Sequence, residues 1–503
     1  MGKKRLIFAL SGTLLCYAVF LFFSPLYYSS DSLMAALIVD GFFSPTNNIS
    51  QFQHPLFCFL VRFLTPLLPT ADVFTMLLHL TTAFGFFSIL FFGSARFEDR
   101  KMKTWRVEDY AFVVILSLTV FFLSAGVNIW NNNYTITAGA FVFMGLVVSS
   151  PHRNDASRRT TAQTVSSVLL IAMGIMLRRE SALLFIPFII LDLLSTVIDS
   201  PAAWKHVLRR YAPCLIAFTI LITSRAVFYS IDPYATASRY NDARTAIMDF
   251  PMKGAWEAGI DPVDYNAALD WGFADTDIMN VDMLEKIATA GARDAYPLTW
   301  NGLQGVLKKM ARDLFHTNLY MSILVGIIAV LLLRNLLISS RWCRIESLLA
   351  VLGAFLIMAY FTFRGRAPMR VWEPVLFATT FVLIRAGIPL SSTPSEIGRS
   401  VTSERLQLAK RWRGTVETIT MLLLAIALWF SAGQVMAYAV PNDRIQTTLT
   451  ARINVDDDEY EPSFTTLFIW PNWHGTIPRY FEHKGTLPSQ RVIDNNIALG
   501  DWT

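Results

Sequence analysis

The chain of 503 residues is 53% hydrophobic and only 16% charged. About a quarter of the residues of an ordinary soluble protein are charged, so the composition excludes a soluble domain of the usual kind. The net charge of +5 does not indicate nucleic-acid binding, because the basic residues lie in short stretches between apolar runs, where they set membrane topology.

The apolar runs are roughly 17–22 residues long, which is enough to cross a hydrocarbon core of about 30 Å. They predict an all-α, polytopic transmembrane protein with about eleven spans, in a transmembrane domain over 1–440 that is followed by an extracytoplasmic tail over 441–503. In chain order the predicted spans are 6–27, 73–93, 110–126, 134–150, 164–177, 182–198, 212–230, 317–336, 347–363, 374–389 and 416–438.

The segment from Met1 to Arg5 contains basic residues and precedes the first apolar run. No small-x-small cleavage site follows that run. The first run therefore predicts a retained span whose N-terminus lies in the cytoplasm. The basic loops that follow then fall mainly on the cytoplasmic side, as the positive-inside rule requires. We expect a multi-pass protein of the plasma (cytoplasmic) membrane with its C-terminus outside, in contact with membrane lipid.

The predicted first outer loop, residues 28–72, carries the most distinctive polar groups of the N-terminal half. Asp31, Asp40 and His54 lie in it, and the stretch from Tyr27 to Pro55 has no lysine or arginine. We expect the catalytic residues in this acidic loop at the membrane rim. Each group also has a structural interpretation: Asp31 as a helix N-cap, Asp40 as a helix-end residue, and His54 as a structural histidine.

The run from Leu56 to Leu68 is short, contains Arg62 and Pro66, and suits a helix that lies flat at the interface. If this run crossed the membrane, the basic residues between 94 and 109 would fall outside, against the positive-inside rule. The first outer loop is therefore predicted to hold an interfacial helix.

Basic residues on the predicted outer side are informative, because topology does not favour them there. Charges near membrane depth usually face a water-filled cavity or a partner, and arginine forks suit bidentate phosphate binding. His54 of the first outer loop is one candidate substrate-binding residue. The others come from three outer connections, the third being the long outer segment 231–316, and they are Arg178, Arg179 and Glu180; Arg364, Arg366 and Arg370; Arg244 and Asp249.

Simpler explanations stay open for each of these clusters. Arg178 and Glu180 could pair with each other, Arg244 and Asp249 could form a salt bridge within their segment, and the cluster from 364 to 370 could hold lipid headgroups.

No cysteine or histidine spacing indicates a metal site or a disulfide framework. Asp31 together with Asp249 could hold a hard divalent cation, since carboxylate oxygens suit such ions. No other cofactor is indicated.

The start of the chain resembles the GT-C glycosyltransferases, which use polyprenyl-phosphate sugars. The resemblance rests on a cytoplasmic first span, on Ser30-Asp31 early in the outer loop with Gly41 ten residues on, and on the flat helix after His54. It implies a catalytic aspartate in the first outer loop and a lipid-phosphate donor at the outer leaflet. The superfamily often has a second acidic residue after that aspartate, whereas Ser32 follows Asp31 here. The segments YNDARTAIMDFP and RGRAPMRV are also similar to an uncharacterised group of bacterial polytopic membrane proteins.

The resemblance predicts an integral-membrane glycosyltransferase that moves a sugar from a lipid-linked donor to a cell-envelope glycan, lipid or protein acceptor on the outer face. Asp31, or else Asp40, would be the general base, and the outer arginines would stabilise the leaving phosphate. Two other classes remain: a transporter or flippase of a lipid-linked or anionic solute, and a non-catalytic or polymerase/ligase-type protein of envelope polysaccharide assembly. A transporter would favour internal repeats, and the sequence shows none.

Overall fold

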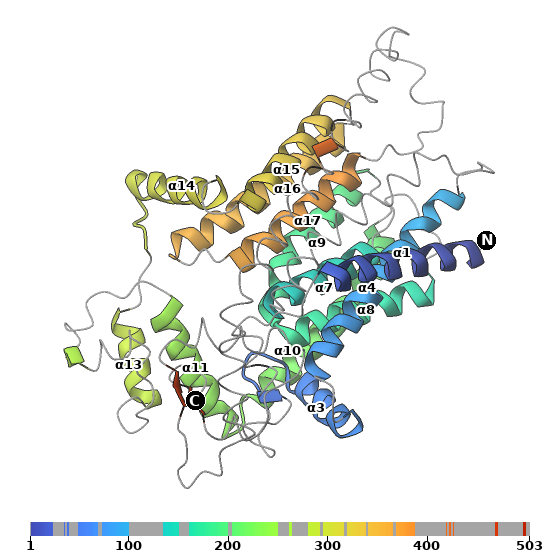
Figure 1. The fold of residues 1–503 in the computed structure, drawn as a ribbon. Helices are drawn as coiled ribbons and strands as arrows, with labels where there is room; N and C mark the ends of the chain where they lie inside the picture. The colour runs from blue at the N-terminus through green and yellow to red at the C-terminus, as the bar shows by residue number, and fades with distance from the viewer. Residues whose placement is uncertain are drawn as a thin grey trace.

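Long helices dominate the structure and pack side by side (Figure 1). The computed structural model describes residues 2–23, 35, 38–39, 49–68, 73–99, 134–149, 160–199, 204–249, 261–263, 280–291, 295–315, 319–338, 341–365, 369–387, 419, 422–423, 426, 468–470 and 496–498. The helices of the N-terminal half are α1 (Gly2–Phe23), α3 (Pro55–Leu64) with the 3-10 turn η1 (Thr65–Leu67), α4 (Val73–Asp99), α7 (Tyr134–Ser149), α8 (Thr161–Leu177), α9 (Arg179–Asp199) and α10 (Trp204–Phe228).

The second half continues the helical pattern and ends in a small strand pair. Its helices are α11 (Tyr234–Asp249), α13 (Val281–Gly291), α14 (Trp300–Phe315), α15 (Leu319–Ile338), α16 (Arg341–Phe363) and α17 (Met369–Gly387). The fold-class prediction named no strand, yet β1 (Phe468–Trp470) and β2 (Asn496–Ala498) pair in parallel within the C-terminal tail. Ile469 lies opposite Ile497 there, a β-branched pair that suits a strand.

The prediction of an all-α membrane protein is confirmed at the level of its helices. Nine of the predicted spans coincide with α1, α4, α7, α8, α9, α10, α15, α16 and α17. The predicted span 110–126 lies outside the described residues, and 416–438 lies almost entirely outside them, so the total of eleven stays a prediction. Within the described part of the chain, three helical stretches are long and apolar enough to cross a membrane: Val73–Gly93, Tyr211–Phe228 and Cys343–Phe363.

Polar contacts between helix ends show how neighbouring helices alternate in direction. Gln163 at the start of α8 donates to Val148 O at the end of α7 (2.8 Å), while Arg178 after α8 donates to Thr135 Oγ1 at the start of α7 (2.7 Å). Likewise, Asn335 near the end of α15 donates to Ser347 Oγ near the start of α16 (2.9 Å). The helix ends predicted to lie outside therefore collect at one end of the bundle.

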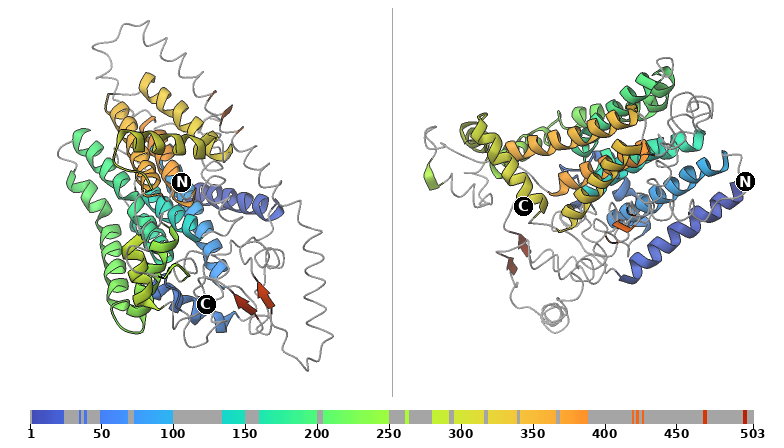
Figure 2. Two further views of the ribbon diagram at one scale, coloured as in Figure 1. Left: turned by 90° about the vertical axis from the view of Figure 1, so that its left-hand side faces the viewer. Right: turned by 90° about the horizontal axis from the view of Figure 1, so that it is seen from above.

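The edge of the bundle is formed by α1, which packs on α4 (Figure 2). Tyr17 of α1 donates its hydroxyl to His79 O of α4 at 2.7 Å. The buried apolar side chains form a core between α4, α7 and α8, a second one among α14 to α17, and a third that joins α7 to α10 with α16 and α17. Every described helix that coincides with a predicted span thus packs against at least one other helix.

The closest helix pair is α7 against α8, and two glycines permit its approach. A Cβ added at Gly174 would lie 2.6 Å from Ala138 O, and one added at Gly145 would lie 2.9 Å from Ser167 O. Backbone atoms cannot move away as a flexible side chain can, so any larger residue must push the two helices apart. Small residues at helix contacts are typical of membrane bundles.

We expect Gly174→Ala to lower the midpoint of thermal unfolding of the detergent-purified chain, because overpacking costs about 1–3 kcal/mol. Gly326→Ala is the matched control, since a Cβ at Gly326 of α15 meets nothing within 4 Å. That control should unfold at the same temperature as the wild type or higher, as alanine favours a helix over glycine by about 1 kcal/mol. Equal shifts in both variants would contradict the close-approach role of Gly174.

Candidate functional site

The segment 49–54 lies in the first predicted outer loop, and Arg225 and Tyr229 at the end of α10 donate three hydrogen bonds to its carbonyl groups. Arg225 donates to Gln53 O at 2.6 Å and to Gln51 O at 2.5 Å. Tyr229, one helical turn further on, donates to Ser50 O at 3.0 Å. We call residues 49–54 the anchored segment. Two distant parts of the chain, about 170 residues apart, thus meet through a single buried guanidinium.

Arg225 is held tightly at this position. Its guanidinium lies 4.4 Å from the centroid of the Tyr229 ring, close enough for a cation–π interaction. The arginine residue is only 9% exposed, so its charge is largely removed from water. A buried charge is stable only when it is paired and hydrogen-bonded, and the carbonyl oxygens of the anchored segment meet part of that need.

His54 closes the anchored segment and begins α3. Its Nδ1 accepts from Leu56 N at 3.1 Å, which makes it the N-cap of the helix, with Pro55 in the first turn. Its Nε2 lies 2.9 Å from Leu221 O and 3.1 Å from Ser224 Oγ of α10. Because Nδ1 accepts, Nε2 carries the proton and donates to Leu221 O.

Both ring nitrogens of His54 are therefore engaged within the protein, and the ring is buried. Burial lowers the pKa of His54 below its ordinary value, and Arg225 lowers it further, although the bond to Leu221 O opposes them. The neutral imidazole fits this environment at pH 7. Its contacts match the structural interpretation that the sequence left open, while its assignment to substrate binding gains no support from them.

Four arginines gather beside the anchored segment, and we call them the arginine cluster: Arg178, Arg179, Arg225 and Arg244. Arg178 follows the last residue of α8, Arg179 begins α9, Arg225 lies near the end of α10, and Arg244 lies in α11. Phe52 is the common centre, with the guanidinium carbon of Arg178 at 5.8 Å and that of Arg244 at 6.0 Å from its ring centroid.

Arg178 and Arg244 are each oriented by neutral partners. Arg178 donates to Thr135 Oγ1 (2.7 Å) and to the Tyr134 hydroxyl (3.3 Å), and Arg244 donates to Asn241 Oδ1 at 2.8 Å. Arg244 is 5% exposed. These hydrogen bonds orient both guanidinium groups beside the Phe52 ring.

Two carboxylates lie close to the cluster. Glu180 accepts from Arg179 Nε at 2.7 Å and lies 3.7 Å from Arg178 Nε, so the pairing of Arg178 with Glu180 that the sequence left open is present but weak. Asp242 of α11 has a pKa above its ordinary value because of partial burial, and the nearby charges of Arg179 and Arg225 oppose that rise. Among the side chains that the structure describes, the four arginines of the cluster thus lie near two carboxylates.

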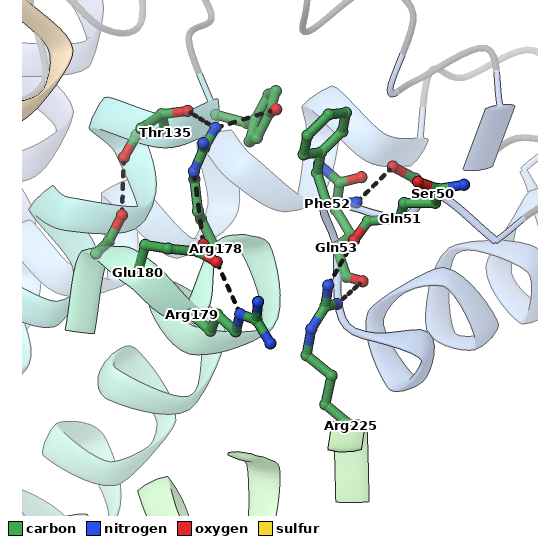
Figure 3. A network of polar contacts seen from close by, with 11 residues as sticks. Ser50, Gln51, Phe52, Gln53, Thr135, Arg178, Arg179, Glu180 and Arg225 are labelled. Atoms are coloured by element: carbon green, nitrogen blue, oxygen red, sulfur yellow. Dashed lines mark hydrogen bonds and ion pairs between the residues drawn. The ribbon is translucent and has the colours of Figure 1, made fainter. Parts of the chain in front are cut away.

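Figure 3 shows the Arg179 side chain across from that of Arg225, which extends to the carbonyl groups of the anchored segment, with Arg178 nearby. Like charges in this arrangement repel each other, and an anion between them would relieve the repulsion. Two further groups are unsatisfied within the described residues: the buried side-chain amide of Gln53 and Nε of Arg225 have no hydrogen-bond partner. The arrangement can therefore bind an anion that also accepts or donates hydrogen bonds.

The other residues predicted for the site are only partly described. Asp31, Asp40 and Arg366 lie outside the described residues. Asp249 and Arg370 are described only as residues of α11 and α17, without their side chains.

Arg364 follows the last turn of α16, where its N–H donates to Tyr360 O at 3.0 Å. Of the predicted cluster members, the structure brings together Arg178, Arg179, Glu180 and Arg244.

Sequence reasoning missed Arg225, Tyr229, Phe52 and Asp242. Arg225 had one usable signal, since it is a lone arginine in the last two turns of an otherwise apolar helix, and charges so placed usually have a partner. Phe52 gave no signal, because an aromatic residue beside a membrane span is common.

Among the described residues, no group of side chains could hold a metal ion at this site. In the described part of the chain, no three histidine, cysteine, aspartate or glutamate side chains come together. The cation hypothesis for Asp31 and Asp249 rests on side chains outside that part. The chain matches no protein-family model, no curated protein and no solved structure.

We expect Arg225→Lys to loosen the anchored segment, because one ammonium group cannot donate to two separate carbonyl oxygens as a guanidinium does. Charged hydrogen bonds of this kind are worth about 1.5–3 kcal/mol. Amide hydrogen exchange at residues 50–53 should accelerate by about tenfold or more, whereas exchange within α7 should not change.

Arg239→Lys is the matched control for this experiment. Arg239 pairs on the surface with Glu285 (2.7 Å), and its side chain is 53% exposed. Exposed pairs contribute little to stability, so exchange in the anchored segment should match the wild type. Unchanged exchange in Arg225→Lys as well would show that the segment is held by other contacts.

Proposed function

We propose that the chain is an integral-membrane glycosyltransferase that takes a sugar from a polyprenyl-phosphate donor and passes it to a cell-envelope acceptor on the outer face. One observation carries the proposal: the four guanidinium groups of the arginine cluster gather at one end of a bundle of apolar helices, with two carboxylates near them among the described side chains. Guanidinium forks match the geometry of phosphate oxygens and hold them bidentately.

A lipid-linked phosphate suits the surroundings of the cluster better than a soluble one. The helix α3 follows directly after the anchored segment, and Leu56, Phe59 and Phe63 are exposed on it. Helices of this amphipathic kind lie in the membrane interface. A donor whose phosphate sits at the arginine cluster could thus leave its polyprenyl chain in the lipid beside α3.

In the proposed reaction, Asp31 accepts the proton of the acceptor hydroxyl as that oxygen attacks the anomeric carbon of the donor sugar. The bond from the anomeric carbon to the phosphate oxygen breaks, and the polyprenyl phosphate leaves with its electron pair. The arginine cluster stabilises the negative charge that develops on this phosphate. Asp40 is the second candidate for the base, since it belongs to the same loop.

The anchored segment gives this assignment a structural basis. Arg225 takes part in the arginine cluster and also fixes the end of the loop that carries Asp31 and Asp40. The proposed base and the proposed phosphate site are in this way connected through one residue.

A transporter or flippase of an anionic lipid is the second candidate, because the same cluster would bind its substrate. The two functions differ in a simple measurement. A glycosyltransferase turns over in detergent solution and releases polyprenyl phosphate, whereas a transporter has no product there.

We expect Asp31→Asn to reduce sugar transfer by about 10²–10⁴-fold, the usual contribution of a general base. The assay is release of polyprenyl phosphate from a panel of polyprenyl-phosphate sugars, with purified protein in detergent. Asp261→Asn is the control, since Asp261 lies in the long outer segment, away from the first loop. Turnover of Asp31→Asn near the wild-type rate would remove Asp31 from the mechanism and leave Asp40 to be tested.

We expect Arg179→Lys to weaken binding of a polyprenyl phosphate by about 10- to 100-fold, because the charge is kept but the fork is lost. Arg179 is chosen because its side chain is 45% exposed and thus accessible to a ligand. Arg239→Lys again serves as control and should bind as the wild type does. Equal affinity of both variants for the lipid phosphate, measured in nanodiscs, would rule out a phosphate fork at Arg179.

A further inference from the structure

The helix α14 has one broad apolar surface made of two adjoining faces, and only one of these faces is covered by the described residues. Val306, Met310 and Leu314 are buried in the core that α14 shares with α15, α16 and α17. Ser322 at the start of α15 donates to Leu314 O at 2.8 Å, which fixes the end of α14 to the bundle.

The second apolar face is exposed. Trp300, Leu303 and Leu307 follow one another at the spacing of a helix face, and they are 69%, 46% and 40% exposed. Phe315 at the end of the helix and Leu298 just before it are exposed as well. Single exposed apolar residues need no explanation, but a continuous stripe indicates a partner.

Cationic side chains border this stripe. With 100° per residue, Lys308 and Arg312 lie next to the apolar face, on the side away from the buried one. Lys309 is further round and pairs with Asp313 at 2.8 Å. The helix thus carries three basic residues and one acidic residue, with the basic edge beside the exposed apolar stripe.

The position of α14 in the fold limits what can cover the stripe. It lies at an end of α15 and α16 and runs across their direction rather than alongside them (Figures 1 and 2). Its 16 residues extend about 24 Å, and its four charged residues exclude it as a membrane span.

We propose that α14 lies on the membrane surface, with Trp300, Leu303 and Leu307 in the acyl boundary and Lys308 and Arg312 among anionic lipid headgroups. Two observations favour lipid over a protein partner. The adjoining helix α16, which is long and apolar enough to cross a membrane, exposes Leu352, Leu356 and Tyr360. A basic edge beside an apolar stripe with a tryptophan is the pattern of an interfacial helix.

The test uses the full chain in vesicles of phosphatidylcholine with phosphatidylglycerol. A photoreactive diazirine amino acid replaces Leu303 or Leu307 in turn. Asn301 is the matched control because it is exposed on the basic edge between Lys308 and Arg312, at the level of the headgroups rather than in the acyl boundary. After irradiation, mass spectrometry measures adducts to lipid and to protein. All three positions are exposed, so the substitutions should leave the fold intact, and helix content by circular dichroism checks this.

Lipid adducts at 303 and 307 should exceed those at 301 by several-fold, and phosphatidylglycerol should be enriched in them relative to the vesicle composition. Replacing Lys308 and Arg312 together by glutamate should remove that enrichment. Adducts to protein at 303 and 307 would instead assign the stripe to a partner chain or a second copy. Equal lipid adducts at all three positions would also overturn the proposal. None of these results depends on the proposed enzymatic function.

Discussion

One buried guanidinium, that of Arg225, holds the first outer loop against the helix bundle. It donates to Gln51 O and Gln53 O, and Tyr229 adds a bond to Ser50 O. Carbonyl oxygens of a loop have no regular partner, and a charge near a membrane helix end needs one. The guanidinium and the loop carbonyls therefore satisfy each other. His54, the N-cap of α3, also bonds to Leu221 O of α10, which fixes the start of α3 beside the same helix.

The position of the other arginines follows from this constraint. Once the anchored segment is fixed, Phe52 lies between Arg178 and Arg244, and their cation–π contacts bring α8 and α11 to the same centre. The gathered arginines repel one another, and an anion between them would relieve the repulsion.

Two amphipathic helices complete the arrangement at the borders of the bundle. In α3 the buried side packs on the core around Phe57 and Val61, and in α14 around Val306 and Met310, while leucines remain exposed on both. Between α3 and α14, the close packing of α7 against α8 at Gly145 and Gly174 holds the bundle together. A rigid frame of this kind can keep a polar site in place beside lipid, where the hydrophobic effect between helices is weak.

The sequence by itself determined the apolar helices, because apolar runs of sufficient length leave the backbone no other way to satisfy its hydrogen bonds in lipid. It also singled out Arg178, Arg179 and Arg244, since topology disfavours positive charge where they lie. It did not predict α11, α13 and α14, which are not long apolar runs. Only the tertiary structure decided that Arg225 and Phe52 join them, and that His54 serves as a helix cap. The contacts of Arg225 and Phe52 link residues more than 120 positions apart, and no local pattern of spacing records which distant groups will meet.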